Sequence, residues 1–428
     1  MVAAVVFFTA CKNEKTLPTA LVSTDGAVAA GSYFTNDNNG NPVLCWTEQD
    51  VKDSLFRLKY AVFDAESNSF GKTITVPASA GSSNSAESMG KIAFKSDGTV
   101  VAVFSKRFPE EKNPFAGAIC YSISKDSGFS WSDAQYLHSD TTHAYGRSFF
   151  DVAVLKDGEL ATVWLDGRYA KEIKGSALFF ARTEKGKGFG IDSCLEKGTC
   201  ECCRTDLLTD EQGNLHLAYR DIMYPSVLSG KQVRDMVYKL SKDGGKTFTA
   251  PKTISPDNWE LDGCPHSGPS LANTPKGINA LWFTAGGGAG IYHSVSNGLG
   301  GDFISRKLIS SSGRHPQMIK LENGDLAMAF EEMEVTEPVH GKEMHHSAGE
   351  KKTNHSHGAM KMSHGPAGSS KVVLKVVSDG GVRKSIDITK GEFPDNHAVL
   401  TETKGGVLIA WVRDGHKGSQ IYYSLVKI

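Results

Sequence analysis

The chain has 428 residues, of which 39% are hydrophobic and 22% are charged, and its formal net charge is −1. Such a composition is typical of a large globular protein, and the near-neutral charge argues against nucleic acid or an anionic membrane surface as a partner. Glycine occurs 45 times, phenylalanine 21 times and tyrosine 12 times, and long apolar runs are few. This pattern favours an all-β protein with many short strands and turns.

The N-terminal segment 1–11 differs from the rest of the chain. It reads MVAAVVFFTAC, an apolar run that is too short to span a bilayer. The run resembles the end of a bacterial lipoprotein signal peptide, with Cys11 as the lipidated residue. It therefore predicts export to the bacterial cell envelope and a lipid anchor in the membrane, in an oxidising compartment. The alternative is a frayed N-terminus with an incidental cysteine. We expect residues 12–428 to form a single domain.

A repeat runs along the whole chain. In each unit a glycine is followed six residues later by an aromatic residue, with alternating apolar residues between them. These glycines are Gly40, Gly98, Gly158, Gly213, Gly277, Gly324 and Gly405. A short strand precedes each glycine, and one or two more follow each aromatic residue. Four antiparallel strands at this period predict a β-propeller of seven four-stranded blades, with six blades as the alternative.

The seventh unit lacks a fourth strand of its own. The segment LPTALVS at 17–23 has strand character but is not preceded by three other strands. We predict that it becomes the outermost strand of the blade that contains Trp411 and Tyr422. This pairing would close the ring and remove two exposed sheet edges.

Two units carry a second motif, SKDSGFSW at 124–131 and SKDGGKTF at 241–248. The aspartate of such a turn can accept hydrogen bonds from nearby backbone amides, while the aromatic residue packs between strands. With these motifs, nearly the whole chain resembles the sialidase-like Asp-box (BNR repeat) β-propellers. The resemblance implies a glycosidase or a glycan-binding propeller.

The sialidase catalytic motif is not matched. In that family an early Arg-Ile-Pro supplies one of three arginines that grip the sugar carboxylate, a Tyr–Glu pair is the nucleophile and an aspartate is the acid/base. Arg-Ile-Pro does not occur here, and the first repeat contains no arginine. Three arginines do precede first strands and are candidates for binding an anion: Arg147, Arg204 and Arg314.

Cysteines and histidines precede several first strands. In a propeller the first strands line the central channel, so residues just before them surround the channel mouth. We expect seven such residues to converge on one metal centre: Cys200, Cys202, Cys203, Cys264, His266, His315 and His397. Thiolate and imidazole together suit copper(I) or zinc. The sequence therefore predicts copper as the bound metal, with zinc as the alternative.

Disulfides are the alternative explanation of these cysteines, for instance Cys194–Cys200 or Cys203–Cys264 in an exported protein. Against it, the C-x-C-C pattern offers adjacent sulfurs that cannot easily bridge each other. Lipidation of Cys11 would also leave an odd number of thiols, seven of the eight. The two remaining cysteines, at positions 45 and 120, fall within strand patterns and are expected in the core.

An insertion at 333–368 separates the second and third strands of the sixth unit. Its histidines and methionines are candidate auxiliary ligands: His340, Met344, His345, His346, His355, His357, Met360, Met362 and His364. Thioether and imidazole groups together favour copper(I). The alternative is a solvated linker with a biased composition.

Charged residues end several second strands and are candidates for acid/base roles: Asp166, Arg168, Arg220, Asp221, Glu331, Glu332, Arg413 and Asp414. Simple solvation of strand ends explains them equally well. The leading hypothesis is metal handling, delivery or sensing in the envelope, with another envelope or periplasmic metalloprotein as a partner. A metalloenzyme using the same centre and a sialidase-like glycosidase or glycan-binding propeller remain alternatives.

Overall fold

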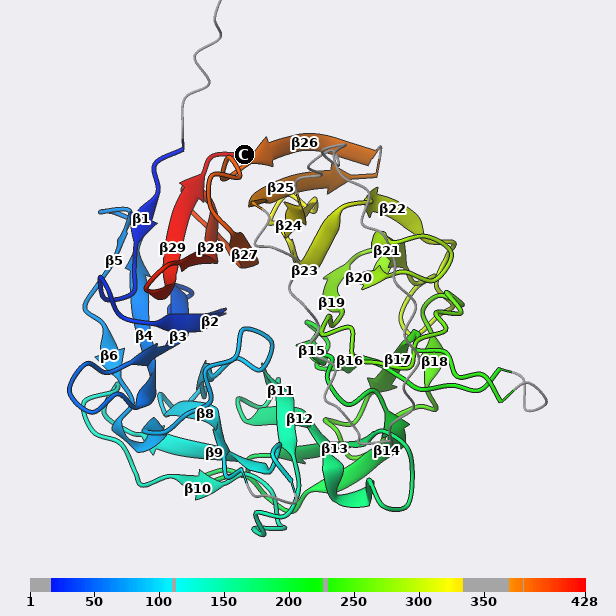
Figure 1. Cartoon of the computed structure of the whole chain (residues 1–428), viewed down its shortest axis with the longest axis horizontal. Helices are drawn as coiled ribbons and strands as arrows, with labels where there is room; N and C mark the ends of the chain where they lie inside the picture. Colours follow the sequence, from blue (N-terminus) through cyan, green and yellow to red (C-terminus); the bar gives the residue numbers. More distant parts are fainter. Residues whose placement is uncertain (1–16, 110–112, 226–229, 334–368, 380) are drawn as a thin grey trace, which may run out of the picture.

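The computed structural model describes residues 17–109, 113–225, 230–333, 369–379 and 381–428. Seven antiparallel sheets surround a central axis, and Figure 1 shows the ring viewed along that axis. The predicted seven-bladed propeller is confirmed, and the six-bladed alternative is wrong. The described residues include two 3₁₀ turns, η1 (Pro77–Ser79) and η2 (Gly167–Tyr169), but no α-helix, and none of their helical segments is long and apolar enough to cross a membrane.

Within each blade the strands are given in order from the innermost strand to the outermost. The strands of blades one to three are β2 (Ala29–Asn36), β3 (Pro42–Gln49), β4 (Phe56–Asp64), β5 (Ser69–Phe70) and β6 (Ile74–Thr75); β7 (Lys91–Phe94), β8 (Val100–Arg107), β9 (Gly117–Ser124) and β10 (Gln135–Tyr136); and β11 (Arg147–Val154), β12 (Leu160–Asp166), β13 (Ser176–Arg182) and β14 (Ser193–Thr199).

Blades four to seven follow the same order. Their strands are β15 (Asp206–Thr209), β16 (Leu215–Arg220), β17 (Met236–Ser241) and β18 (Lys252–Thr253); β19 (Ser270–Thr274), β20 (Gly277–Thr284), β21 (Gly290–Val295) and β22 (Lys307–Ser310); β23 (Gly313–Lys320), β24 (Leu326–Met333), β25 (Ser370–Ser378) and β26 (Gly381–Asp387); and β27 (Asp395–Thr403), β28 (Gly406–Gly415), β29 (Gly418–Val426) and β1 (Ala20–Leu21).

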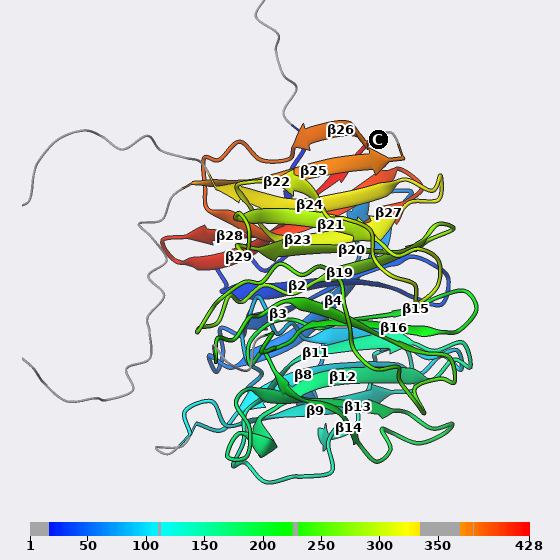
Figure 2. The same ribbon diagram turned by 90° about the vertical axis from the view of Figure 1, so that its right-hand side faces the viewer.

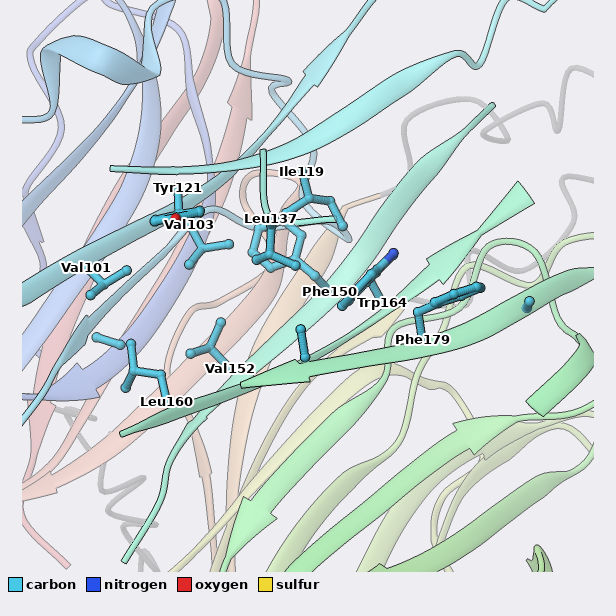
Figure 3. Packing of buried hydrophobic residues seen from close by; sticks show 13 residues of the cluster. Val101, Val103, Ile119, Tyr121, Leu137, Phe150, Val152, Leu160, Trp164 and Phe179 are labelled. Atoms are coloured by element: carbon cyan, nitrogen blue, oxygen red, sulfur yellow. The ribbon is translucent and has the colours of Figure 1, made fainter. Parts of the chain in front are cut away.

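The core lies between the blades. Every residue of β12 and of β20 is buried, because each sheet is covered on both faces by its neighbours. Figure 3 shows one such layer, where Val101 and Ile119 of blade two pack with Val152, Trp164 and Phe179 of blade three. Figure 2 shows the ring from the side, with the strands running from one face to the other.

Tryptophans of the repeat are held by buried hydrogen bonds. Trp46, Trp164, Trp282 and Trp411 are all fully buried. Each indole N–H donates to a carboxylate: Trp46 to Glu48 at 2.8 Å, Trp164 to Asp166 at 3.2 Å, Trp282 to Asp257 at 2.8 Å and Trp411 to Asp395 at 3.0 Å. Since a buried tryptophan needs a partner for its N–H, these acids are part of the fold.

Polar side chains also join consecutive innermost strands. The Leu207 amide donates to Asp151 at 2.7 Å, which links blades three and four. The Met318 amide donates to Ser270 Oγ at 3.0 Å and links blades five and six in the same way. These bonds fix the spacing of the strands that line the channel.

The turns over 124–131 and 241–248 share one hydrogen-bond pattern. In the first, Asp126 accepts from the Ser130 amide at 2.8 Å, and Ser124 Oγ accepts from the Gly128 amide at 2.8 Å. In the second, Asp243 accepts from the Thr247 amide at 2.9 Å. The bonds satisfy the backbone of each turn locally, so these aspartates have a structural role.

The ring closes as the sequence predicted. Strand β1 pairs antiparallel with β29 in blade seven, with Ala20 opposite Tyr423 and Leu21 opposite Tyr422, and the two strands lie side by side in Figure 1. The Ile421 amide also donates to Ser23 Oγ at 3.0 Å. The segment 17–23 therefore supplies the outermost strand of the last blade.

Deleting residues 17–23 should lower the free energy of unfolding by roughly 2–3 kcal/mol. The deletion exposes the edge of β29 and removes the apolar contacts of Leu17 and Val22, each worth at most about 1.5–3 kcal/mol when fully buried. Urea unfolding followed by tryptophan fluorescence measures the loss. Deletion of residues 12–16 is the control, and equal stability of the two deletion proteins would contradict the closure.

Candidate metal centre at the channel mouth

Four cysteines come together from two links between blades. Cys200, Cys202 and Cys203 lie on the link from β14 to β15, and Cys264 lies on the link from β18 to β19. The first link is fixed where it leaves β14, because the Cys200 amide donates to the Arg220 carbonyl at 3.1 Å. The backbone therefore places three thiols at the start of blade four.

The three thiols form a compact buried cluster. Cys200, Cys202 and Cys203 are 1%, 5% and 2% exposed, and their sulfurs all lie within 4.8 Å of one another. The Cys200 sulfur is 4.0 Å from that of Cys202 and 3.5 Å from that of Cys203. Half-buried Cys264 packs against this cluster. The seven cysteines within the described residues are all free in this structure, and Cys45 and Cys120 are buried in the core as expected.

Arg234 supplies positive charge to the thiol cluster. Its side chain is buried, and Nη1 donates to Cys200 Sγ at 3.1 Å and to Glu201 at 2.6 Å. Hydrogen bonding among the thiols, together with Arg234, lowers the pKa of Cys200, whereas burial raises the pKa of Cys203 to about 12. One thiolate is thus favoured in the absence of a metal, and a bound cation would ionise the others.

The predicted histidine ligands lie elsewhere at the mouth. His315 and His397 belong to a second group with Glu87, and neither joins the group of three cysteines. His266 is exposed, and its Nδ1 lies 3.0 Å from the Cys264 carbonyl oxygen. The seven predicted ligands are therefore divided between a thiol cluster and a Glu/His group.

The Glu/His group consists of Glu87, His315 and His397. The Nε2 atoms of His397 and His315 lie 3.1 Å and 3.7 Å from Glu87 Oε1. The two imidazole rings are stacked with their centroids 4.1 Å apart. Arg204 Nε lies 2.9 Å from the other oxygen of Glu87. Burial raises the pKa of Glu87, but the charges of Arg204 and the two histidines outweigh it and lower the pKa to about 2.

A repeated bulge positions both histidines. The pairing of β23 with β24 is interrupted between Arg314 and Gln317, and that of β27 with β28 between Asn396 and Val399. At these bulges His315 and His397 have φ of 44° and 50°, values that residues other than glycine seldom adopt. His315 lies nine residues before Gly324, and His397 lies nine residues before Gly406. Equivalent positions in two neighbouring blades thus bring the two rings together.

The candidate anion-binding arginines have separate partners. Buried Arg147 lies 3.0 Å from Asp140 and 3.1 Å from Asp166. Arg204 faces Glu87, and Arg314 lies over the ring of Phe283, 4.3 Å from its centroid. The structure does not gather these guanidinium groups around a common anion, and their role in binding one remains a prediction.

Most charged residues at the ends of second strands also have structural partners. Asp166 accepts hydrogen bonds from Arg147, Trp164 and Arg168. The remaining contacts are Arg220 with the carbonyls of residues 234, 267 and 283, Arg413 with Asp395, Glu331 with His315, Glu332 with Ser310, and Asp414 with Asn396. Burial and the charge of Glu196 raise the pKa of Asp221 to about 7.

Two residues of the mouth were missed by the sequence analysis, Glu87 and Arg234. Glu87 stands eleven residues before Gly98, just as His266 stands eleven before Gly277, so its position in the repeat was a usable signal. No comparable signal marks Arg234. The predicted lipidation residue Cys11 and the predicted auxiliary ligands at 340–364 lie outside the described residues.

Comparisons with known proteins establish the fold alone. No family model and no curated protein sequence matches the chain. A protein of unknown function from Dyadobacter fermentans is similar over 97% of this chain and 99% of its own, at 13% identity and a TM-score of 0.51. The polysaccharide lyase Uly1 is similar over 93% of this chain and 90% of its own, at 12% identity and a TM-score of 0.52. The NanB sialidase of Streptococcus pneumoniae is similar over 92% of this chain and 85% of its own, at 11% identity and a TM-score of 0.48. The chain therefore shares the β-propeller fold with these proteins.

Proposed function

We propose that the propeller binds a thiophilic metal ion through Cys200, Cys202 and Cys203, with Cys264 as a fourth ligand. The spacing of the sulfurs carries this proposal. An ion bound at about 2.3 Å to each sulfur would hold them roughly 3.8–4.0 Å apart, and two sulfurs of the cluster lie 3.5 Å and 4.0 Å from the third. The side chains therefore need little movement to bind an ion.

Charge and burial support the same function. Three thiolates around a monovalent ion would leave two negative charges in a buried site. Arg234 lies against Cys200 and offsets part of this charge. Such an environment favours a soft cation, and copper(I) is the preferred ion because it accepts two or three thiolates. Zinc is the alternative and would require Cys264 to complete four ligands.

Metal analysis tests the proposal directly. The purified full chain is incubated under reducing conditions with copper(I) or zinc, dialysed against a competing chelator and analysed for bound metal and reactive thiols. We expect tightly bound metal together with protection of several thiols from alkylation. A protein that retains neither ion, or whose cysteines are all in disulfides, would overturn the proposal.

The biological role we propose is the handling, delivery or sensing of this metal in the bacterial envelope. The lipoprotein-like segment ending at Cys11 supports export and anchoring, and the histidines and methionines of 333–368 offer weaker, exchangeable ligands. Another envelope metalloprotein would be the partner. If the bound ion supports turnover of a substrate, the protein is a metalloenzyme that uses this ion.

Removal of residues 338–366 should reduce metal capacity but leave the tight site. The fold should survive, because β24 and β25 pair continuously from Leu326 opposite Val377 to Met333 opposite Ser370. Equilibrium dialysis before and after the deletion measures capacity, and circular dichroism checks the fold. Loss of all bound metal in the shortened protein would show that the cysteines are not the principal site.

A glycan-directed function is the second candidate. A cavity of about 1160 Å³ lies among the turns that join first and second strands, at the end of the ring opposite the cysteines. Asparagine, glutamate and lysine side chains line it, and its volume suits an oligosaccharide better than an ion. The shared fold with a polysaccharide lyase supports this candidate. Turnover of a fluorogenic sialoside, or shortening of an acidic polysaccharide, would establish it, and inactivity on both with no binding to glycans would exclude it.

A further inference from the structure

We infer that Glu87, His315 and His397 form a second metal site, separate from the thiol cluster and suited to a divalent ion. One oxygen and two nitrogen ligand atoms lie within 4.8 Å of one another at the channel mouth. The site contains no sulfur, and its residues come from blades one-to-two, six and seven rather than from the cysteine links. The inference stands independently of the proposed thiol site.

The other nitrogen of each histidine already has an acceptor. His315 Nδ1 pairs with the Glu331 carboxylate, and His397 Nδ1 lies 2.6 Å from Asn396 Oδ1. In a neutral ring whose Nδ1 donates to that acceptor, Nε2 is the atom left to bind a metal. A carboxylate or amide behind the imidazole is the usual arrangement for a metal-binding histidine.

Both Nε2 atoms lie near the carboxylate of Glu87, 3.1 Å and 3.7 Å from Oε1. In neutral rings these two atoms and Oε1 are all acceptors, and a cation bound between them would offset their mutual repulsion. Glu87 is only 8% exposed, and Arg204 lies against its Oε2, whereas its Oε1 accepts no hydrogen bond. Since a buried carboxylate oxygen without a donor is costly, a divalent ion bonded to Oε1 and to both Nε2 atoms would remove this penalty.

The space beside the histidines fits an ion. A cavity of about 10 Å³ is lined by Arg204, His315 and His397 among others but not by Glu87, so it lies beside the three ligand atoms. That is close to the room one water molecule needs and far too small for a sugar. Both histidines have positive φ, as Phe149 and His266 do, so this backbone conformation comes from the repeat and fixes where the two rings lie.

The donor set indicates the class of metal. Two imidazoles and one carboxylate suit zinc, iron(II), cobalt(II) or copper(II), and they leave coordination positions free for water or a substrate. Arg204 directly follows Cys203 and lies against Glu87, so one short segment reaches both the thiol cluster and this site. The two sites would hold different ions because their donors differ.

Crystals of the full chain soaked in cobalt(II) test the inference by anomalous diffraction. We expect a cobalt peak about 2.0–2.2 Å from Glu87 Oε1 and from both Nε2 atoms. In solution, Glu87→Gln and His397→Asn should each weaken binding of one cobalt(II) ion by at least about tenfold. Asparagine is chosen because it tolerates positive φ, so the bulge should persist.

His266→Asn is the matched control. His266 is an exposed histidine with φ of 48°, outside the Glu/His group, and its replacement should leave the cobalt peak and affinity unchanged. A peak at the thiols or elsewhere with none between Glu87 and the histidines would overturn the inference, as would unaltered cobalt binding by both Glu87→Gln and His397→Asn. Cobalt at the Glu/His group with no metal at the thiols would support this inference while refuting the proposed function.

Discussion

Cys203→Ser protein should bind copper(I) or zinc more than about a hundredfold more weakly than the wild type. Loss of a residue that only supports a ligand typically weakens metal binding by roughly 10–100-fold, and loss of a ligand should exceed that. Serine replaces the sulfur that lies 3.5 Å from that of Cys200 by a hydroxyl, and a neutral hydroxyl is a poor ligand for a soft ion. Competition with a chromophoric chelator measures the change.

Cys194→Ser is the matched control for this experiment. Cys194 lies on β14, only six residues before Cys200, but it is exposed and outside the thiol cluster. Its replacement should leave metal affinity unchanged. The Cys203→Ser protein should remain folded, because a buried hydroxyl without a partner costs only about 1–3 kcal/mol. Equal affinities of the two variants would refute the thiol cluster as the site.

Asp166→Ala should destabilise the protein by about 3–5 kcal/mol, the usual effect of removing one partner of a buried ion pair. The Asp166 carboxylate is fully buried and lies 3.1 Å from Arg147 Nε and 2.7 Å from Arg168 Nη2. It also accepts the indole N–H of Trp164. The alanine variant leaves these donors with one partner fewer inside blade three. Urea unfolding at neutral pH measures the loss.

Asp53→Asn provides the comparison at the surface. Asp53 and Arg57 are separated by only 2.6 Å, but the pair is open to solvent. Its loss should shift the unfolding midpoint far less than Asp166→Asn does, because water screens such pairs. Similar shifts in the two variants would contradict the assignment of Asp166 as a central structural charge.

The contribution of Asp166 should also depend on pH. Burial raises its pKa, but the Arg168 hydrogen bond and the charges of Arg147 and Arg168 outweigh burial and hold the pKa below its usual value. A carboxyl whose pKa is lower in the folded state stabilises the protein fully above its unfolded pKa of about 3.9. The stabilisation is lost as the pH falls through the folded value. The wild type and Asp166→Asn should therefore converge in stability as the pH falls from the unfolded pKa through the lower folded pKa of Asp166.

Almost all of the architecture could be predicted from the sequence. The glycine-to-aromatic repeat depends on local turns and on burial of second strands, and both recur in every blade. The closing strand was also foreseeable, because a missing fourth strand and a spare first strand complement each other. The pairing of Ala20 with Tyr423 confirms this reasoning.

The site was predictable only in part. Cys200, Cys202 and Cys203 are neighbours in the chain, so their convergence needed no long-range information. Residues such as His315 are aimed by a bulge with positive φ, and neither the bulge nor its direction could be deduced from ligand types alone. Glu87 was not predicted, because the expected soft-metal site was based on thiol and imidazole ligands and a carboxylate is a hard ligand. The expected single centre consequently became two groups.

The pairing of β1 with β29 has a consequence for the order of folding. Strand β1 comes before the other described strands and pairs with β29, which follows them all, and the bond between Ser23 and Ile421 joins residues 398 positions apart. Blades one to six can each form from consecutive residues, whereas blade seven must wait until β29 has been made. Contacts between such distant residues form slowly, since a long loop has to close first. Until then β29 has a free edge that can pair with another chain. Copies of this protein are therefore most prone to aggregate before β1 pairs with β29, and a chaperone that covers the edge of β29 would protect them during that interval.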